Sequence, residues 1–113
     1  MTQENCIFCK IVNREFKTDF IVETQDYVSF NDITPRAPIH ALVIPKKHFA
    51  SLNEIEDVEL MGKLLKGAKE TAAKLGVADN YRLVINTGEK AGQAVFHIHI
   101  HVLGGRSMQW PPG

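Results

Sequence analysis

The 113-residue sequence has no excess of charge of either sign and no long apolar run, and each absence excludes a class of protein. Lysine and arginine together number 13, as do aspartate and glutamate, so the formal net charge is zero. Nucleic-acid-binding domains usually carry a basic excess, so we expect no nucleic-acid partner, although a single nucleotide is still an acceptable ligand. No apolar run reaches the length of a transmembrane helix, so we expect no membrane partner.

Cysteine is also scarce, with two residues near the start of the chain. The opening MTQENCIFCK has polar residues where a secretory signal would have its apolar core, which predicts a cytoplasmic protein. Because that compartment is reducing, Cys6 and Cys9 are expected to be thiols or metal ligands rather than a disulfide. The length predicts one domain over residues 1–113, small enough to benefit from a metal site or an obligate dimer.

The order of the predicted elements is typical of an α+β fold with a mainly antiparallel sheet of about five strands, one short helix and one long helix. Gln25-Asp26 suits a tight turn between the first two strands, and Pro45 ends the third. A polar loop over 86–93 precedes the last strand. The strands are predicted at 20–24, 27–32, 39–45, 81–86 and 96–103, and the helices at 5–14 and 56–75.

Apolar residues recur at three- and four-residue steps along the long helix and predict one buried stripe. Gly76 is a natural stop, while Ser51 and Glu54 form a capping-box pattern that allows an alternative start near residue 52. Gly62 and Gly67 weaken the helix but allow another element to approach it closely. The stripe consists of Val58, Met61, Leu64, Leu65, Ala68, Ala72 and Leu75.

Three of the five histidines stand at alternate positions in FHIHIHVL, residues 96–103. In a strand, alternate side chains share a face, so His97, His99 and His101 are predicted to point the same way. That face must then meet a ligand, a metal or solvent. The opposite face is the expected core and holds Phe96, Ile98, Ile100 and Val102.

Three interpretations of this histidine face are open on the residues alone. The first is a surface strand with a polar face. The second is a catalytic metal site, since a His-x-His pair on a strand can bind zinc and leave one position for water. The third is nucleophilic attack on phosphorus by a neutral imidazole, with a second imidazole and the backbone N–H groups of the preceding glycine loop holding phosphate oxygens.

The run HIHIHVL (97–103) resembles the histidine triad motif, in which histidines alternate with apolar residues. With its other segments, the chain is similar to the Hint branch of the histidine triad (HIT) superfamily of nucleotide hydrolases and transferases. The resemblance implies a HIT-like fold, a homodimer whose sheet continues across both subunits, and cleavage of purine nucleoside monophosphate–amine conjugates through a nucleotidyl-histidine intermediate. The similar segments are IFCKI (7–11), FNDITPRAPIHALVIPKKHF (30–49), GQAVFHIHIHVLGGR (92–106) and WPPG (110–113).

The resemblance implies roles for three catalytic histidines. His99 would be the nucleophile, His101 would contact the phosphate or the leaving group, and His40 would support the proton state of the nucleophile. Ala94 departs from the pattern, because many Hint proteins have a hydroxyl residue there that assists the leaving group. Since an alanine side chain cannot donate a hydrogen bond, leaving-group preference and rate are expected to differ.

The resemblance also implies which residues contact the nucleotide. Asp32 would accept hydrogen bonds from the ribose hydroxyls, although an aspartate ahead of Thr34-Pro35 is equally typical of a turn. Asn86 would lie near the phosphate or ribose, although it can simply end a strand. Apolar residues would form the purine wall, although such residues are more often plain core. The wall consists of Ile7, Phe8, Phe30 and Ile33, and the other contacts implied are Gly92, Gln93, Ala94, Val95 and Trp110.

The spacing Cys6-x-x-Cys9 does not by itself distinguish a metal site from a redox pair or from two buried thiols. A tetrahedral zinc site needs about four ligands. Microbial HIT proteins that this chain resembles combine such a pair with two histidines in a structural zinc site, which implies Cys6, Cys9, His48 and His97 as zinc ligands. That site would pin the N-terminal helix to the sheet and lie near the nucleophile.

The tail around Trp110 is too apolar and stiff for a free end. In the Hint branch it reaches toward the partner's active site, and packing on its own subunit is the alternative. The dimer interface is expected to use the long helix and a sheet edge.

Two alternative functions keep the same pocket. One is a dinucleoside polyphosphate hydrolase, against which the Hint-like tail argues, and the other is a nucleotide-binding or scaffold protein without turnover.

Overall fold

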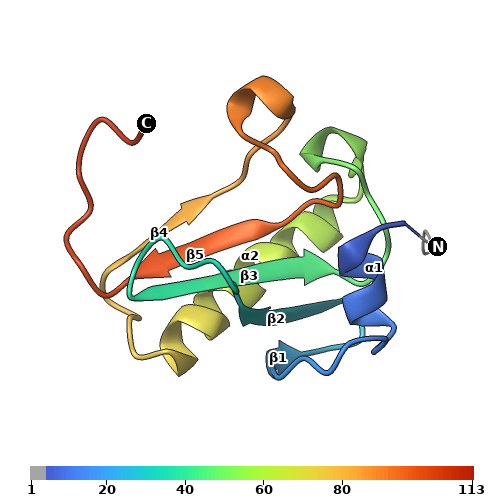
Figure 1. Cartoon of the computed structure of the whole chain (residues 1–113), viewed down its shortest axis with the longest axis horizontal. Helices are drawn as coiled ribbons and strands as arrows, with labels where there is room; N and C mark the ends of the chain where they lie inside the picture. Colours follow the sequence, from blue (N-terminus) through green and yellow to red (C-terminus); the bar gives the residue numbers. More distant parts are fainter. Residues whose placement is uncertain (1–4) are drawn as a thin grey trace.

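The computed structural model describes residues 5–113, in which five strands form one antiparallel sheet with the order β1-β2-β3-β5-β4 (Figure 1). This confirms the predicted α+β class and the predicted order of elements. The strands are β1 (Phe20–Glu23), β2 (Tyr27–Asn31), β3 (Ile39–Pro45), β4 (Tyr81–Val84) and β5 (Ile100–Gly104). The helices are α1 (Ile7–Val12) and α2 (Val58–Lys74), and the 3-10 turns are η1 (Leu52–Glu54) and η2 (Glu89–Ala91).

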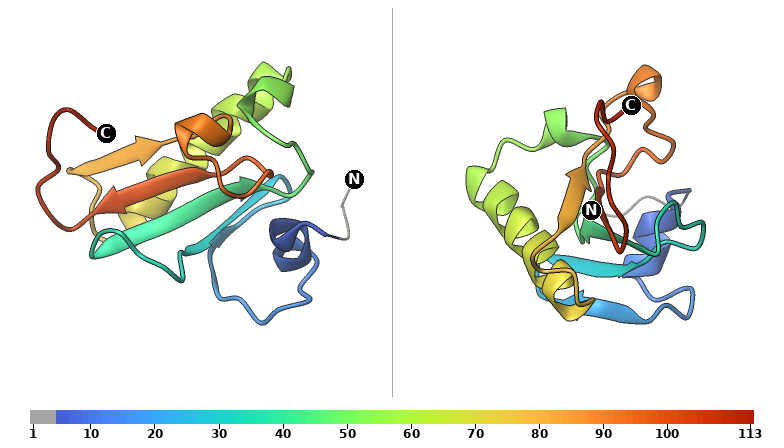
Figure 2. Two further views of the ribbon diagram at one scale, coloured as in Figure 1. Left: turned by 45° about the horizontal axis from the view of Figure 1, so that its top comes forward. Right: turned by 90° about the vertical axis from the view of Figure 1, so that its left-hand side faces the viewer.

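α1 and α2 lie on opposite faces of the sheet, as the right-hand view of Figure 2 shows. α2 covers one face and contacts β1, β2, β3 and β5. α1 is much shorter and covers only part of the other face, where its Phe8 packs against Phe30 and Leu42. Neither helix within residues 5–113 has the length and apolar character of a membrane-crossing segment.

β3 lies at the centre of the sheet and is buried on both faces, which accounts for its almost unbroken apolar sequence, IHALVIP. Alternate residues of a strand face opposite layers. Ala41 belongs to the core under α2, whereas Leu42 belongs to the core under α1. His40 shares a face with Leu42, so β3 places a buried polar ring on the α1 side of the sheet.

The long helix begins at Val58, because Asp57 caps it by accepting a hydrogen bond from the N–H of Glu59 at 2.9 Å. Ser51 instead caps the separate turn η1, where it accepts from the N–H of Asn53 at 3.2 Å. The capping pattern at Ser51 therefore belongs to a short turn, and the alternative helix start near residue 52 is wrong.

The predicted apolar stripe of α2 is only partly buried. Leu64, Ala68 and Ala72 are buried against the sheet. Val58 and Leu65, which the pattern assigned to the same stripe, are 77% and 49% exposed. These two lie seven positions apart and share one exposed margin of the helix, directly beside the buried stripe.

The predicted strand over 96–103 is wrong in its first half, because β5 begins at Ile100. Phe96, predicted to face the core, is 50% exposed, although Ile98 is buried as expected. The ladder with β3 ends at the pair Val43–Ile100. Beyond it on β3 comes Pro45, which has no N–H to donate to a ladder. Residues 96–99 consequently leave the sheet, and the three histidines do not form one continuous row.

Candidate active site and metal cluster

A pocket of about 540 Å³ lies on the α1 side of the sheet, within the size range of small-molecule sites. α1 gives it an apolar wall, β2 and β3 contribute side chains from the sheet, and the loop after η2 and β5 complete it. The lining includes the predicted residues Ile7, Phe8, Phe30, Asp32, Ile33, His40, Asn86, Gly92, Ala94, Val95, His99 and His101.

Sequence reasoning missed several other residues that line this pocket. Spacing could have found two of them, because Ile11 lies one helical turn after Ile7 and Leu42 lies two strand positions after His40. Asn31 is the last residue of β2, and the other three come from connecting segments, which have no periodicity to reveal a face. The missed residues are Ile11, Thr18, Asn31, Thr34, Arg36 and Leu42.

Gln93 and Trp110 lie outside this lining. Gln93 is buried and braces the loop, donating from Nε2 to the carbonyl of Ala50 at 2.6 Å and accepting at Oε1 from the N–H of Gly88 at 2.9 Å. Trp110 is 80% exposed, and its ring centroid lies 5.9 Å from the guanidinium carbon of Arg82 on β4 of the same chain. Within one chain, the tail therefore extends away from the pocket.

The loop after η2 presents backbone donors to the pocket. The amide N–H groups of Ala94 and Val95 donate no hydrogen bond within residues 5–113, and the same holds for the side chain of Asn86. Gly92 turns the chain here with a φ of 103°, which side-chain-bearing residues rarely adopt. Clustered donors of this kind suit the oxygens of a phosphate group.

Hydrogen bonding fixes which ring nitrogen of His99 carries a proton. Nδ1 lies 2.9 Å from the carbonyl oxygen of His97, so the Nδ1–H donates to it. Burial lowers the pKa of His99, so the ring is neutral near pH 7 and Nε2 has a free lone pair. The edge-on ring of Phe8, at a centroid distance of 5.1 Å, packs against this imidazole. The arrangement leaves a neutral ring with an oriented lone pair, which is what a nucleophile requires.

A second pair of imidazoles forms a relay. The N–H of Arg36 donates to Nδ1 of His40 at 2.9 Å, so neutral His40 carries its proton on Nε2 and donates it to Nδ1 of His101, also at 2.9 Å. His101 therefore carries its own proton on Nε2. Burial lowers the pKa of His40, and burial and the neighbouring histidines lower the pKa of His101 to about 4. The carboxylate of Asp32 lies 3.4 Å from Nε2 of His40.

The same bonds disfavour a metal held by Asp32, His40 and His101, although one ligand atom from each lies within 4.8 Å of the others. A metal on Nε2 of His40 would need the lone pair of that atom. Nδ1 already accepts from the N–H of Arg36, so Nε2 of the neutral ring is protonated. A hydrogen-bonded relay fits these side chains better than a catalytic zinc ion.

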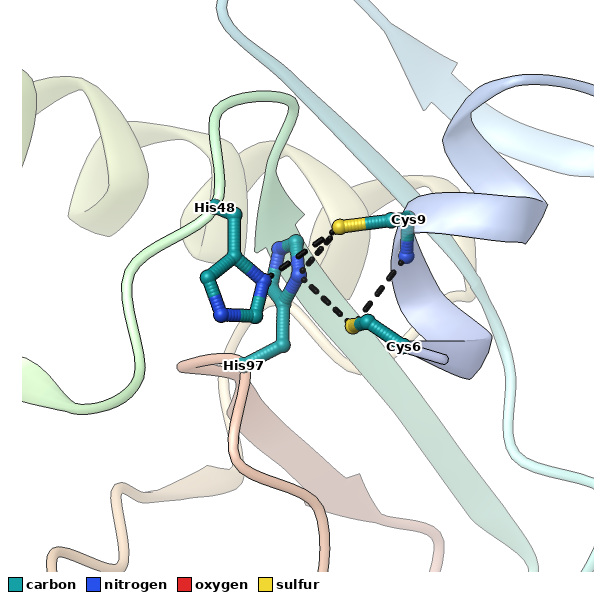
Figure 3. Close-up of side chains that lie close together, drawn as sticks. All are labelled: Cys6, Cys9, His48 and His97. Atoms are coloured by element: carbon teal, nitrogen blue, oxygen red, sulfur yellow. Dashed lines mark hydrogen bonds between the residues drawn. The ribbon is translucent and has the colours of Figure 1, made fainter. Parts of the chain in front are cut away.

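A second cluster consists of Cys6 and Cys9 from the start of α1, His48 from the loop after β3, and His97 (Figure 3). Sγ of Cys6 lies 3.3 Å from Nδ1 of His97. Sγ of Cys9 lies 3.3 Å from Nδ1 of His48 and 3.5 Å from Nδ1 of His97. His97 donates its Nε2–H to the carbonyl of Pro45 at 2.9 Å, which leaves the lone pair of Nδ1 toward the sulfurs.

These separations fit a tetrahedral zinc ion. Zinc with bonds of about 2.3 Å to sulfur and about 2.05 Å to nitrogen holds such ligands roughly 3.6 Å apart. Metal-bound histidines usually donate their other N–H to a carbonyl or carboxylate, as His97 does. Burial also lowers the pKa of His97 to about 4, so the ring is neutral, as a ligand must be. Four protein ligands would close the site, so a metal held there would supply structure.

Comparison with known proteins assigns the family. The profile of the HIT domain matches residues 13–108 of the chain. The protein belongs to the HIT family. It is 49% identical over 112 residues to an uncharacterized HIT-like protein of Synechocystis sp., across 97% of this chain and 98% of the relative.

Solved HIT structures share the fold. A HIT family hydrolase from Legionella pneumophila is 46% identical with a TM-score of 0.91, over 96% of this chain and 100% of that one. A histidine triad nucleotide-binding protein from Candida albicans is 34% identical with a TM-score of 0.82, over 95% of this chain and 83% of that one. The predicted membership of the histidine triad family is therefore confirmed.

Proposed function

We propose that this HIT protein is a phosphoramidase of the Hint branch, which hydrolyses the P–N bond between a purine nucleoside monophosphate and an amine. The observation that carries the proposal is the fixed tautomer of His99, whose Nδ1–H is held by a carbonyl while Nε2 keeps its lone pair. Among similar structures are HIT family hydrolases and a histidine triad nucleotide-binding protein, which supports both the reaction class and the ligand class.

The two ends of the pocket suit the two ends of a nucleotide. The purine would lie among apolar side chains of α1 and β2, such as Phe8 and Phe30, whose rings meet edge to face at 5.9 Å. The ribose hydroxyls would donate to Asp32. The phosphate would accept from the side chain of Asn86 and from the loop N–H groups, which have no partner within the described residues.

In the first step, Nε2 of His99 attacks phosphorus, the bond from phosphorus to His99 forms, and the P–N bond to the amine breaks. The positive charge that develops on the imidazole is stabilised by the Nδ1–H bond to the carbonyl of His97. The Nε2–H of His101 hydrogen-bonds to a phosphate oxygen or to the leaving nitrogen, and His40 keeps His101 in that tautomer. The leaving nitrogen takes its proton from solvent as the P–N bond breaks. Water then attacks the nucleotidyl-histidine and returns a proton to solvent, the bond from phosphorus to His99 breaks, and the monophosphate and the neutral ring are released.

The proposal also covers the identity of the metal, the oligomeric state and the cellular compartment. Zinc is the metal that best suits two thiolates and two imidazoles in the Cys–His cluster. A homodimer would pair the exposed margin of α2 and a sheet edge with a second copy, which removes an exposed edge. Cysteines kept as thiolate ligands suit the reducing cytoplasm.

The test is amine release from an adenosine phosphoramidate by the wild type and by His99→Ala, before and after brief chelation, which would strip an open, exchangeable metal site but leave a closed four-ligand cluster loaded. We expect turnover that survives brief chelation and falls at least roughly 10³-fold in His99→Ala, with AMP still bound. A nucleotidyl adduct on His99, detected by mass spectrometry after rapid quenching, would support the covalent step.

Other outcomes would point to the alternative functions. A folded wild type that binds AMP without turnover would be a nucleotide-binding module. Faster cleavage of dinucleoside polyphosphates than of phosphoramidates would make the protein a polyphosphate hydrolase. Loss of activity as soon as a chelator is added would indicate a catalytic metal.

A further inference from the structure

We propose that the Cys–His cluster, when it holds a metal, is a positioning site for the nucleophile. Metal in the cluster holds His97, and the carbonyl of His97 holds the Nδ1–H of His99. The inference rests on the proposed function and makes metal occupancy a condition for fast turnover, beyond any contribution to folding.

The segment that carries the nucleophile has few backbone hydrogen bonds to the rest of the described chain, although the Ile98 side chain packs in the core under α2. Residues 96–99 lie outside the sheet ladder. Within the described residues, the backbone of this stretch is bonded through the N–H of Ile98 to the carbonyl of Phe49 at 2.8 Å, and through the carbonyl of His97 to His99. A catalytic side chain usually depends on a rigid element for its geometry, so this segment needs another anchor.

The ring of His97 is the anchor of this segment. His97 is fully buried and is held on both ring nitrogens, by Pro45 at Nε2 and by the cysteine sulfurs at Nδ1. Without metal, the Nδ1 contacts are weak sulfur hydrogen bonds at 3.3 and 3.5 Å. Coordination replaces them with bonds to an ion that α1 and the loop after β3 also hold. The orientation of the His97 carbonyl then depends on three segments that share the ion, which are α1, the loop after β3 and residues 96–99. The tautomer of His99 depends on the same three segments.

The helix that carries the cysteines, α1, also forms a wall of the pocket. Ile7 and Phe8 lie between Cys6 and Cys9 and line the nucleotide pocket. The ring of Phe8 meets His97 edge to face at 5.9 Å and His99 at 5.1 Å. Because α1 has only six residues, it has little stability of its own. Loss of the metal would therefore loosen one wall of the pocket together with the nucleophile.

The test uses His48, which belongs to the cluster but does not line the nucleotide pocket. His48→Cys keeps a zinc ligand, whereas His48→Ala removes one. We expect His48→Cys to keep zinc and a kcat within about twofold of the wild type, and His48→Ala to lose zinc and at least tenfold in kcat. Leu64→Ala, in the core under α2, is the stability control, which should lower the melting temperature and leave kcat unchanged. All assays run well below the melting temperature of each variant.

A second readout does not depend on turnover. Nitrogen NMR of the His99 ring should show a single Nδ1–H tautomer in the zinc-loaded protein and a mixture of tautomers after zinc is removed. If His48→Ala does not fold, wild-type protein stripped of zinc by prolonged chelation gives the same comparison. Adding zinc back should restore both kcat and the Nδ1–H tautomer of His99. If the zinc-free, folded protein keeps its kcat and the Nδ1–H tautomer, the cluster is only a structural staple. If the loaded wild type has no turnover, the proposed function fails, and the NMR comparison still decides this inference.

Discussion

The two imidazoles at the heart of the pocket carry their protons on opposite nitrogens, Nδ1 in His99 and Nε2 in His101. Their ring centroids lie 4.9 Å apart. Backbone groups set both states, the carbonyl of His97 in one case and the N–H of Arg36, acting through His40, in the other. Identical side chains thus offer the pocket a free lone pair in one case and an N–H donor in the other, which a list of histidines in a sequence cannot reveal.

The half-buried, neutral ring of His101 predicts a loss of stability in mild acid. The pKa of His101 is lowered to about 4 by burial and by His99 and His40, while Asp32 opposes the shift. The unfolded ring titrates near pH 6.5, so between these values the unfolded chain binds more protons and stability falls as pH falls. Allowing for partial solvent access, we expect a loss on the order of 1–2 kcal/mol between pH 7 and 4.5.

The measurement is the free energy of unfolding in urea at each pH, for the wild type and for His101→Gln, which cannot take up a proton. Carboxylates and the Cys–His cluster affect both proteins alike, so the difference between the two curves isolates His101. If the free energy of unfolding changes with pH in the same way in both proteins, folding does not disfavour protonation of His101.

Ala94 offers a prediction about rate. Ala94→Ser puts a hydroxyl beside the loop donors, where it can donate to the leaving group. A hydrogen bond to a charged group contributes about 1.5 kcal/mol or more, so kcat for phosphoramidate cleavage should rise about tenfold with little change in KM. Ala94→Cys has nearly the same shape and only a weak donor, and it should change kcat much less. Equal gains in both variants would assign the effect to packing.

At the scale of elements, Gly67 explains how α2 lies so close to the sheet. A Cβ at this position would meet the ring of Tyr27, with Cζ at 2.8 Å and Cδ1 at 2.9 Å. Tyr27 is itself fixed by a hydrogen bond from its hydroxyl to Glu70 at 3.0 Å. The close approach that Gly67 was predicted to allow is therefore confirmed, and at Gly62 no atom lies within 4 Å.

The two glycines predict opposite stability effects in one helix. Gly67→Ala should lower the free energy of unfolding by about 1–2 kcal/mol, because overpacking against Tyr27 outweighs the gain in helix propensity. Gly62→Ala, the matched control, should raise it by about 0.5–1 kcal/mol. Urea denaturation of both variants measures the difference. A stabilised Gly67→Ala would mean that Tyr27 moves aside at little cost.

Elements whose apolar residues form one run or recur at one regular spacing were predictable from the sequence. Elements whose conformation is set by long-range contacts were not. β3 and α2 were found from an apolar run and a helical stripe, each of which reports burial directly. The alternation in 96–99 looked equally regular, but His97 is drawn into a cluster with Cys6 and Cys9. That contact spans most of the chain and overrides the local period. The pocket residues from connecting segments, such as Thr18 and Arg36, were missed for the same reason.

At the scale of the whole molecule, the exposed margin of α2 predicts association. Val58 and Leu65 are the exposed apolar residues of that margin. Sedimentation equilibrium should give twice the chain mass of 12.7 kDa. Leu65→Glu should shift the equilibrium to monomer, because a buried unpaired carboxylate is costly. Lys90→Glu, an exposed charge change on η2, is the control and should stay dimeric. A monomeric wild type at micromolar concentration would contradict the dimer.

The Cys–His cluster also sets an order of events during synthesis. Cys6 and His97 lie 91 positions apart, and a chain that grows at about 5–20 residues per second separates them by roughly 5–18 s. Throughout that interval Cys6, Cys9 and later His48 lack the fourth member of the cluster, and α1 is too short to persist alone. His99 follows two residues after His97. The complete cluster and the central ring of the pocket thus emerge together, so a nascent chain that stops short of residue 97 has neither.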